Sequence, residues 1–355
     1  MNKSNRYFPI GIVFLATVLV HVVGSLVLSQ FTMPETVRLV AGQLLLVVPT
    51  AIYLYRTKQN PLKALRIRKI KISSALLLVV LTFIMLPVLA LCNAISMLFA
   101  DNIIAGEVST ITQGVPVIVS IILIALIPCI LEESVYRGMF YGKFSEERPV
   151  AAMILSGCLF GLMHMNFNQF VYAFALGCFL PLVVEATDSL VGSMVVHFTI
   201  NANSTFWLCM IPRMQKLLQE MLVQAKDSGD MATAKMIEES GLASDNLMAN
   251  AVNSMSTDKT ALLASIRVYG VLAVIALILG FFILKKIATN QGTWEKMCEM
   301  FSTKQEKSDE KECVGQPAEE LTNGTISRKK EHLVTLPLVI GMVICFGIML
   351  AAQLG

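Results

Sequence analysis

The stretch VPVIVSIILIALIPCILEESVYRG, residues 115–138, decides the fold of this chain. It begins as a long apolar run, which predicts a helix that spans a membrane. It ends on Glu132, Glu133 and Arg137, and ionisable side chains inside a membrane span are costly. The stretch therefore predicts a membrane helix whose charged residues have either a function or a compensating partner.

The composition of the whole chain is that of a membrane protein. Its 355 residues are 55% hydrophobic and 15% charged, with a mean hydropathy of +0.68, whereas soluble proteins carry about 25% charged residues. The basic residues cluster beside apolar stretches, where they indicate topology, and nucleic acid is not expected as a partner. The 8 cysteines show no CxxC or metal-finger spacing and are expected to act as small hydrophobic residues without a disulfide framework.

A membrane helix needs about 20 mostly apolar residues. The stretches that qualify are 8–31, 37–55, 73–100, 114–136, 150–166, 168–186, 188–210, 264–286 and 333–354. The fifth and sixth of these are short and nearly continuous, so the expected number of spans is eight or nine. Open sheet edges cannot face lipid, and we therefore predict an all-α polytopic membrane helix bundle with a polar cavity inside it.

The orientation follows from the distribution of Lys and Arg. The loop RTKQNPLKALRIRKIKIS, residues 56–73, is strongly basic and contains no acidic residue, which predicts a cytoplasmic position. Lys285 and Lys286, which close the eighth predicted span, are then also inside, and the C-terminal tip is outside. We predict a multi-pass protein of a cell membrane, of the bacterial cytoplasmic type.

Eight ionisable residues within or beside the predicted spans are candidates for function. They are His21, Glu132, Glu133, Arg137, His164, Glu185, Asp188 and His197. His21 is expected to pack or form a hydrogen bond, and Glu185 and Asp188 are expected to be solvated at a loop. Glu133 and Arg137 stand four residues apart in the favourable order and are expected to form an ion pair. Glu132 points about 100° away on the same helix and is left available.

Two further short patterns place polar groups at similar depth. In FGLMHMN, Phe160 and His164 share a helix face, and in HFTIN, His197 and Asn201 do the same. A turn at Pro149 would put Glu132 and His164 equally far from the loop that joins their helices. Three helices are therefore expected to present Glu132, His164 and the pair His197 and Asn201 to one internal point.

Two kinds of chemistry fit this set of groups. A carboxylate and an imidazole that hold one water molecule form a general base, and a second imidazole with an amide stabilises a developing oxyanion. Alternatively, Glu132, His164 and His197 could bind a divalent metal such as zinc with an open position. The HExxH spacing of common zinc proteases is absent, and both alternatives stay open.

The ordered motifs EESVYR, FGLMH and HFTIN resemble the CPBP family, which includes type II CAAX prenyl endopeptidases and bacteriocin-processing or Abi-like immunity proteins. The resemblance covers roughly residues 73–210. It implies an intramembrane endopeptidase in which Glu132 and His164 activate water and His197 and Asn201 stabilise the oxyanion. Glu133, Arg137 and Phe160 take supporting roles. Members of this family have been described both as metalloproteases and as glutamic proteases.

With this resemblance, the predicted organisation has six parts. They are N-terminal spans with a basic loop (1–72), a catalytic core (73–210), a polar amphipathic insertion (211–262), a further core span (263–286), a flexible charged linker (287–332) and a C-terminal span (333–355). The expected partners are the lipid bilayer and a peptide or membrane-protein substrate. The alternative functions are a catalytically silent scaffold or immunity protein, and a proton-coupled transporter that uses Glu132 and the histidines as a relay.

Overall fold

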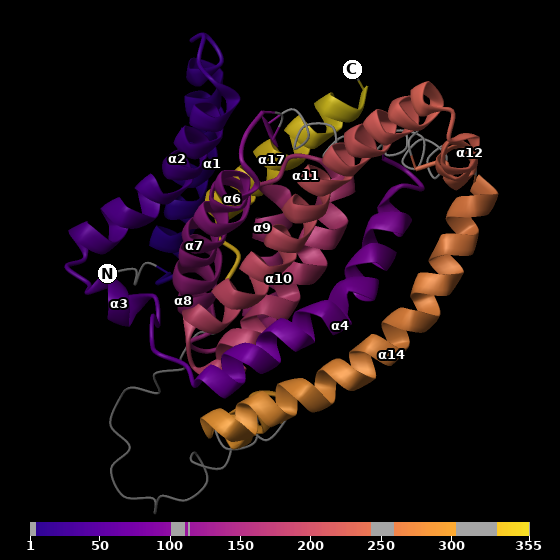
Figure 1. Ribbon diagram of the computed structural model, residues 1–355. Coiled ribbons are helices and arrows are strands. Elements are labelled where there is room, and N and C mark those ends of the chain that lie inside the picture. Colours follow the sequence, from indigo (N-terminus) through magenta and orange to yellow (C-terminus); the bar gives the residue numbers. More distant parts are fainter. Residues whose placement is uncertain (1–4, 101–110, 113, 243–258, 303–331, 355) are drawn as a thin grey trace, which may run out of the picture.

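The computed structural model describes residues 5–100, 111–112, 114–242, 259–302 and 332–354, and these residues form an all-α bundle without strands (Figure 1). Within this part of the chain, 8 helices are long and apolar enough to cross a membrane. They are α1 (Phe8–Leu28), α2 (Glu35–Arg56), α4 (Ile72–Ser96), a composite helix (Val117–Phe144), α10 (Phe167–Thr187), α11 (Leu190–Ser228), α14 (Lys259–Gln291) and α17 (Leu336–Leu354). The predicted multi-pass all-α fold is confirmed.

The stretch predicted as the fifth span forms a shorter helix. Helix α9 (Pro149–Leu162) has 14 residues and is about 21 Å long at 1.5 Å per residue, whereas the hydrocarbon layer is about 30 Å thick. The chain turns after it: Met165 has a positive φ of 52°, and the Asn166 side chain accepts a hydrogen bond from the Gln169 N–H at the start of α10. The predicted span 150–166 is therefore wrong in length, although it is helical.

The composite helix contains two π-helical segments. It runs as α6 (Val117–Ile121), the π-helical segment η1 (Ile122–Leu126), α7 (Ile127–Glu133), the π-helical segment η2 (Ser134–Tyr141) and α8 (Gly142–Phe144). Pro128 lacks an N–H to donate to the preceding turn, and η1 ends two residues before it. Such widened turns often occur at functional sites, and η2 follows directly after Glu132 and Glu133.

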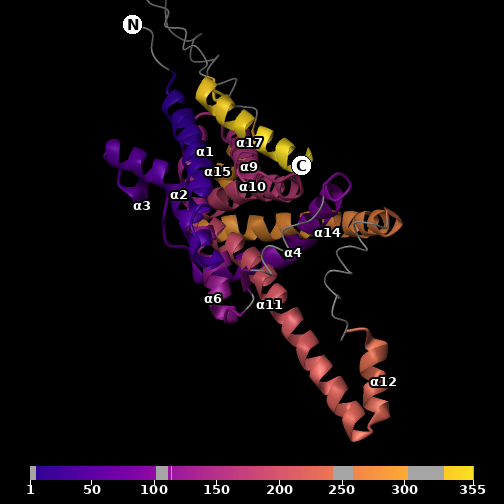
Figure 2. The ribbon, with the colours of Figure 1, turned by 90° about the horizontal axis from the view of Figure 1, so that it is seen from above.

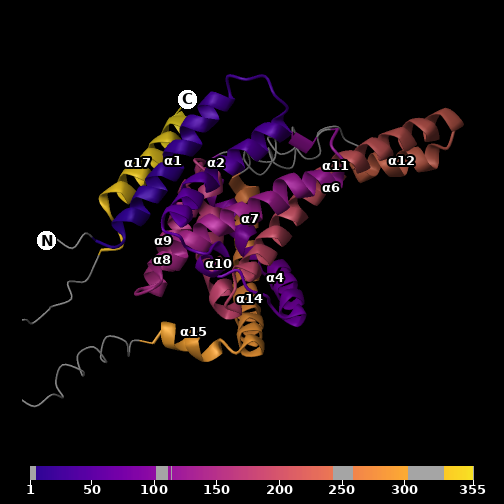
Figure 3. The same cartoon turned by 90° about the vertical axis from the view of Figure 1, so that its left-hand side faces the viewer.

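Helix α11 continues well beyond the predicted end of its span at residue 210. It has 39 residues and is about 58 Å long, so that its second half projects from the bundle. Helix α12 (Met231–Ser240) packs back against this half through Ala234 and Ile237, and Lys226 pairs with Glu238 at 2.6 Å. Figure 2 and Figure 3 show this helical hairpin pointing away from the other helices. The predicted amphipathic helices are present in 211–242, and residues 243–258 lie outside the described residues.

The predicted flexible linker, 287–332, is helical where the structure describes it. Helix α14 continues to Gln291, and α15 (Trp294–Met300) follows after a short turn. Residues 303–331 lie outside the described residues. At this end of the bundle the Lys71 ammonium donates a hydrogen bond to the Asn290 carbonyl, which joins the end of α14 to the basic loop.

Two clusters of apolar side chains hold the bundle together. One is built on α1, the composite helix, α9 and α17, and contains a chain of aromatic contacts that includes Phe14, Phe140 and Tyr136. The other joins α4, α10 and α14 around residues such as Leu81 and Leu180. Helix α17 lies beside α1 (Figure 3). The segments η2 and α9, which carry Arg137 and Phe160, contribute to the first cluster, and α11, which carries His197, contributes Leu190 to the first and Val196 to the second.

Candidate active site

Four helical elements meet at the candidate site. The end of α7 and the start of η2 carry Glu132, Glu133 and Arg137, the end of α9 and the turn after it carry Phe160 and His164, and α11 carries His197 and Asn201. The fourth element is α2, which packs against α7. Three of these elements were expected from the sequence, and α2 was not.

The predicted ion pair is present and fully buried. Glu133 Oε1 lies 3.0 Å from Arg137 Nη1, and both side chains have 0% exposure. The guanidinium lies over the ring of Phe160, 4.2 Å from the ring centre, so that a cation–π contact compensates part of the cost of burial. Because both partners are closed off from solvent, this pair supports the site and does not face a substrate.

Glu133 also holds His197. The Nδ1–H of His197 donates a hydrogen bond of 2.9 Å to Glu133 Oε1, since a carboxylate in an ion pair can only accept. The other ring nitrogen, Nε2, lies 3.8 Å from Glu132 Oε2. Glu133 therefore fixes the His197 imidazole through Nδ1, and the Nε2 side of the ring is turned toward Glu132.

Glu132 has a side-chain exposure of 13%, against 0% for Glu133. Its Oε1 accepts a hydrogen bond of 2.9 Å from Gln43 Nε2 on α2. The Glu132 carboxylate has one amide partner, and the nearest imidazole nitrogen lies 3.8 Å away. The carboxylate can therefore accept a further hydrogen bond from a water molecule. The structure thus separates the two adjacent glutamates into a buried one and a partly open one.

His164 is oriented by its own helix. Its Nδ1–H donates to the Phe160 carbonyl at 2.8 Å, because a carbonyl oxygen only accepts. The ring meets the Phe160 ring edge-on at a centroid distance of 4.8 Å, and His197 meets the same ring at 5.9 Å. The two imidazoles therefore contact the same phenylalanine ring, and Nε2 of His164 is left to hold a proton or a water molecule.

Asn201 lies one turn beyond His197 on α11 and is half-buried. The i,i+4 spacing puts its amide on the same helix face as the His197 ring. The predicted partnership of Glu132 with His164 takes a different form in the structure, because the imidazole closest to Glu132 is that of His197.

The predicted metal site does not fit this arrangement. Among the described residues, no three His, Cys, Asp or Glu side chains come together in a way that could hold a metal ion. Glu132, His164 and His197 as placed do not form a three-ligand set, and we derive no chemical step through a metal.

Glu185 and Asp188 were expected to be solvated, and this expectation is wrong for Glu185, whereas the Asp188 side chain is 36% exposed. Glu185 is 6% exposed and pairs with Arg66 from the basic loop, while Arg66 Nη2 also lies 2.8 Å from Asp188 Oδ1. Tyr141 donates to Glu185 Oε1 at 3.1 Å, and Lys296 contacts the other oxygen at 3.3 Å. The loop folds back over the end of α10, a tertiary contact that local sequence does not encode.

The ionised form of Asp188 is favoured at this position. Burial acts against the charge, but the hydrogen bond and charge of Arg66, followed by the charge of Arg68, hold the pKa of the Asp188 carboxyl below its ordinary value of 3.8. This ionic cluster fixes the basic loop to the start of α11, the helix that carries His197.

The comparison with known protein families agrees with the motif resemblance. A family model described as "Type II CAAX prenyl endopeptidase Rce1-like" matches residues 114–203, which include Glu132, His164, His197 and Asn201. The predicted resemblance to the CAAX endopeptidase group is confirmed for this segment. No curated protein and no solved structure matches the chain.

Proposed function

We propose that this multi-pass membrane protein is an intramembrane endopeptidase that hydrolyses a peptide bond of a peptide or membrane-protein substrate. The observation that carries the proposal is the placement of Glu132, partly open, against His197, which Glu133 fixes from behind. An ionisable side chain inside a membrane span is costly, so a carboxylate that faces an oriented imidazole there is a candidate for function. The family model that matches residues 114–203 describes endopeptidases, which supports the same proposal.

The reaction uses the groups as follows. Glu132, assisted by the His164 imidazole, accepts a proton from a water molecule as the water oxygen bonds to the scissile carbonyl carbon. The negative charge on the carbonyl oxygen is stabilised by the Asn201 amide and the His197 imidazole, the groups to which the family resemblance assigns this role. The proton taken from water then passes to the leaving nitrogen as the C–N bond breaks. Glu133, Arg137 and Phe160 keep the two imidazoles in position.

The test is cleavage of a peptide library by the purified protein in liposomes. Glu132→Gln and His164→Ala are each expected to lower the turnover by about 10²–10⁴-fold, because each removes a group that handles the proton. Glu146→Gln is the matched control, since the Glu146 side chain is 49% exposed at the 145–148 turn. The proposal fails if Glu132→Gln cleaves as fast as this control.

A chelator is included as a separate arm of the same experiment. If activity survives complete removal of divalent metals, then Glu132 activates water without a metal, as proposed above. If chelation abolishes cleavage and zinc restores it, the metal alternative from the sequence is supported, and the imidazoles and Glu132 must rearrange when the ion binds. Either outcome decides between a glutamic and a metal-dependent peptidase.

A further inference from the structure

Gln43 lies outside the segment that matches the endopeptidase family, yet it contacts the acid at the centre of the candidate site. It stands in the middle of α2, and its Nε2 donates to Glu132 Oε1 at 2.9 Å. An amide side chain inside a membrane span needs a partner, and here that partner is the candidate general base. The two residues stand 89 positions apart in the sequence, and no local sequence pattern predicts their contact.

The other end of the same amide has no partner. Gln43 Oε1 is buried and accepts no hydrogen bond from the described residues. The orientation of the amide is fixed by chemistry, because a carboxylate offers only acceptors and the NH₂ group must face it. The oxygen therefore points elsewhere beside Glu132, and a buried acceptor without a donor is costly.

We infer that Gln43 is a further catalytic residue of the site. Its nitrogen fixes the carboxylate of Glu132, and its oxygen accepts one hydrogen bond from the water molecule that Glu132 activates. This inference rests on the proposed function. A water held in this way donates one hydrogen to Glu132 and the other to Gln43, so that a lone pair is directed at the scissile carbonyl. The α1–α2 hairpin is then part of the catalytic machinery as well as a membrane anchor.

The experiment compares variants in the peptide-cleavage assay. Gln43→Met keeps the length of the side chain and removes both the donor and the acceptor. Its kcat is expected to fall by about 10²-fold, since a misplaced water and base cost that much, while KM stays unchanged because the lost interaction is with water rather than substrate. Gln43→Asn keeps the amide but shortens its reach, and its kcat is expected to lie between those of Gln43→Met and the wild type.

The matched control is Leu44→Met, the same substituent at the next position of α2, where the side chain is 55% exposed. Its kcat, KM and thermal unfolding midpoint are expected to equal those of the wild type. The inference is overturned if Gln43→Met retains the kcat of this control, or if it raises KM at constant kcat. Should Gln43→Met unfold, Gln43→Asn decides, and a wild-type kcat in that folded variant overturns the inference as well.

The same data separate the two proposals. If the wild type cleaves, Glu132→Gln does not and Gln43→Met does, the endopeptidase function stands and the role of Gln43 fails. If the wild type cleaves no peptide in the library, the proposed function and the inference about Gln43 both fall.

Discussion

Glu132 and Glu133 are neighbours in the sequence with opposite surroundings. Glu133 is held by Arg137 and His197 and is closed to solvent, whereas Glu132 faces an amide and an imidazole and is partly open. The difference arises because adjacent residues on a helix point about 100° apart. One acid therefore stabilises the arrangement, and the other keeps the capacity to act on water.

The buried pair makes a quantitative prediction about stability. Arg137→Met leaves Glu133 charged and without its cation, and we expect the free energy of unfolding to fall by about 3–5 kcal/mol. The double variant Glu133→Gln/Arg137→Met removes both charges and is expected to recover part of this loss. Unfolding in detergent by urea measures both values.

The control for this measurement is Lys216→Met. Lys216 also stands four residues from its acid, Glu220, but the side chains are 79% and 64% exposed at 3.9 Å, and an exposed pair contributes about 0–1 kcal/mol. Equal losses in Arg137→Met and Lys216→Met would contradict the structural role given to the buried pair.

The sequence predicted those residues of the site whose charge is conspicuous in an apolar span. Glu132, Glu133, Arg137 and the two imidazoles stand out for that reason, and the Glu133–Arg137 pair followed from spacing alone. Gln43 was missed because an uncharged amide is less conspicuous and its partner is far away along the chain. The burial of Glu185 was missed because Arg66 reaches it only after the basic loop folds back.

At the scale of elements, the position of His164 depends on how closely α9 approaches α10. Gly157 and Gly177 face each other, and a Cβ added to Gly177 would lie only 2.6 Å from the Gly157 Cα. The backbones therefore touch, as small residues allow in membrane helices. Phe160 and His164 follow Gly157 by one and two turns, so the glycine contact sets their depth and orientation.

Gly177→Ala is expected to push α9 away from α10. We predict a loss of about 1–3 kcal/mol in the free energy of unfolding, as for other overpacked sites, together with slower peptide cleavage because His164 moves with α9. Thermal unfolding and the cleavage assay measure the two effects. Gly270→Ala on α14 is the control, since a Cβ there meets nothing within 4 Å, and a similar loss in both variants would rule out the close contact as the cause.

Hydropathy alone does not predict where α9 and α11 end. Apolar residues continue past Leu162 in the sequence, and the helix ends there because the chain turns at Met163–Asn166. Helix α11 passes through Pro212 and keeps its winding into a polar segment, where α12 supports it. Both boundaries depend on packing partners, whereas the existence and the helical type of the spans depend on composition.

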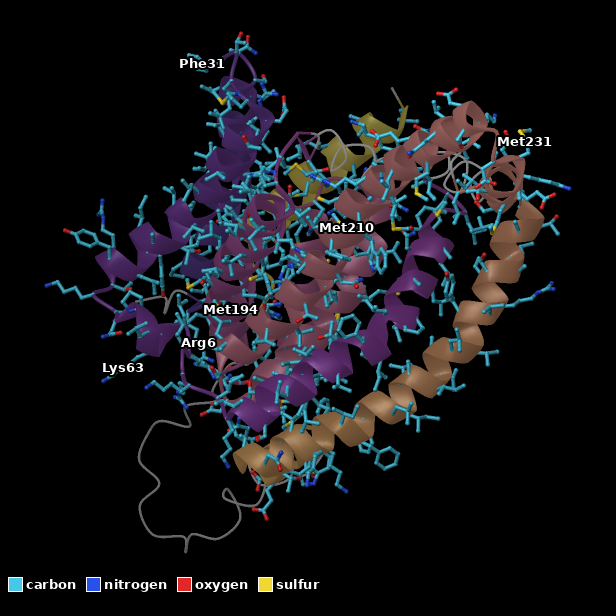
Figure 4. The ribbon with its side chains drawn as sticks, viewed as in Figure 1. Arg6, Phe31, Lys63, Met194, Met210 and Met231 are labelled. Carbon is cyan, nitrogen blue, oxygen red and sulfur yellow. The ribbon has the colours of Figure 1, made fainter. Side chains whose placement is uncertain are left out.

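At the scale of the whole molecule, ion pairs and hydrogen bonds show which loops lie at the same end of the helix bundle. Arg66 and Arg68 bind Asp188, and Lys71 binds the end of α14. Figure 4 places Lys63 and Arg6 toward one end of the bundle, and Phe31 and Met231 toward the other. The distribution of Lys and Arg predicts that the basic end is cytoplasmic, and this prediction places the α11–α12 hairpin on the opposite side.

Labelling with a membrane-impermeant maleimide tests this topology. Between α12 and α15, the residues that the structure describes contain one candidate membrane span, α14. Cys298 is exposed on α15 and is expected to react only after the membrane is permeabilised. Lys235→Cys on α12, in a chain where Cys298 and Cys313 are replaced by alanine, is expected to react in intact cells, because the Lys235 side chain is 74% exposed on the outer hairpin.

The same chain without Lys235→Cys provides the background, and peptide cleavage by each variant verifies that it is folded. The topology requires the two positions to react from opposite sides. If both react in intact cells, or if both need permeabilisation, α14 does not cross the membrane, and its burial against α4 must be explained by a helix pair that stays on one side. The composite helix and α11, which carry Glu132 and His197, are candidate spans in their own right, so that result would leave their placement unchanged.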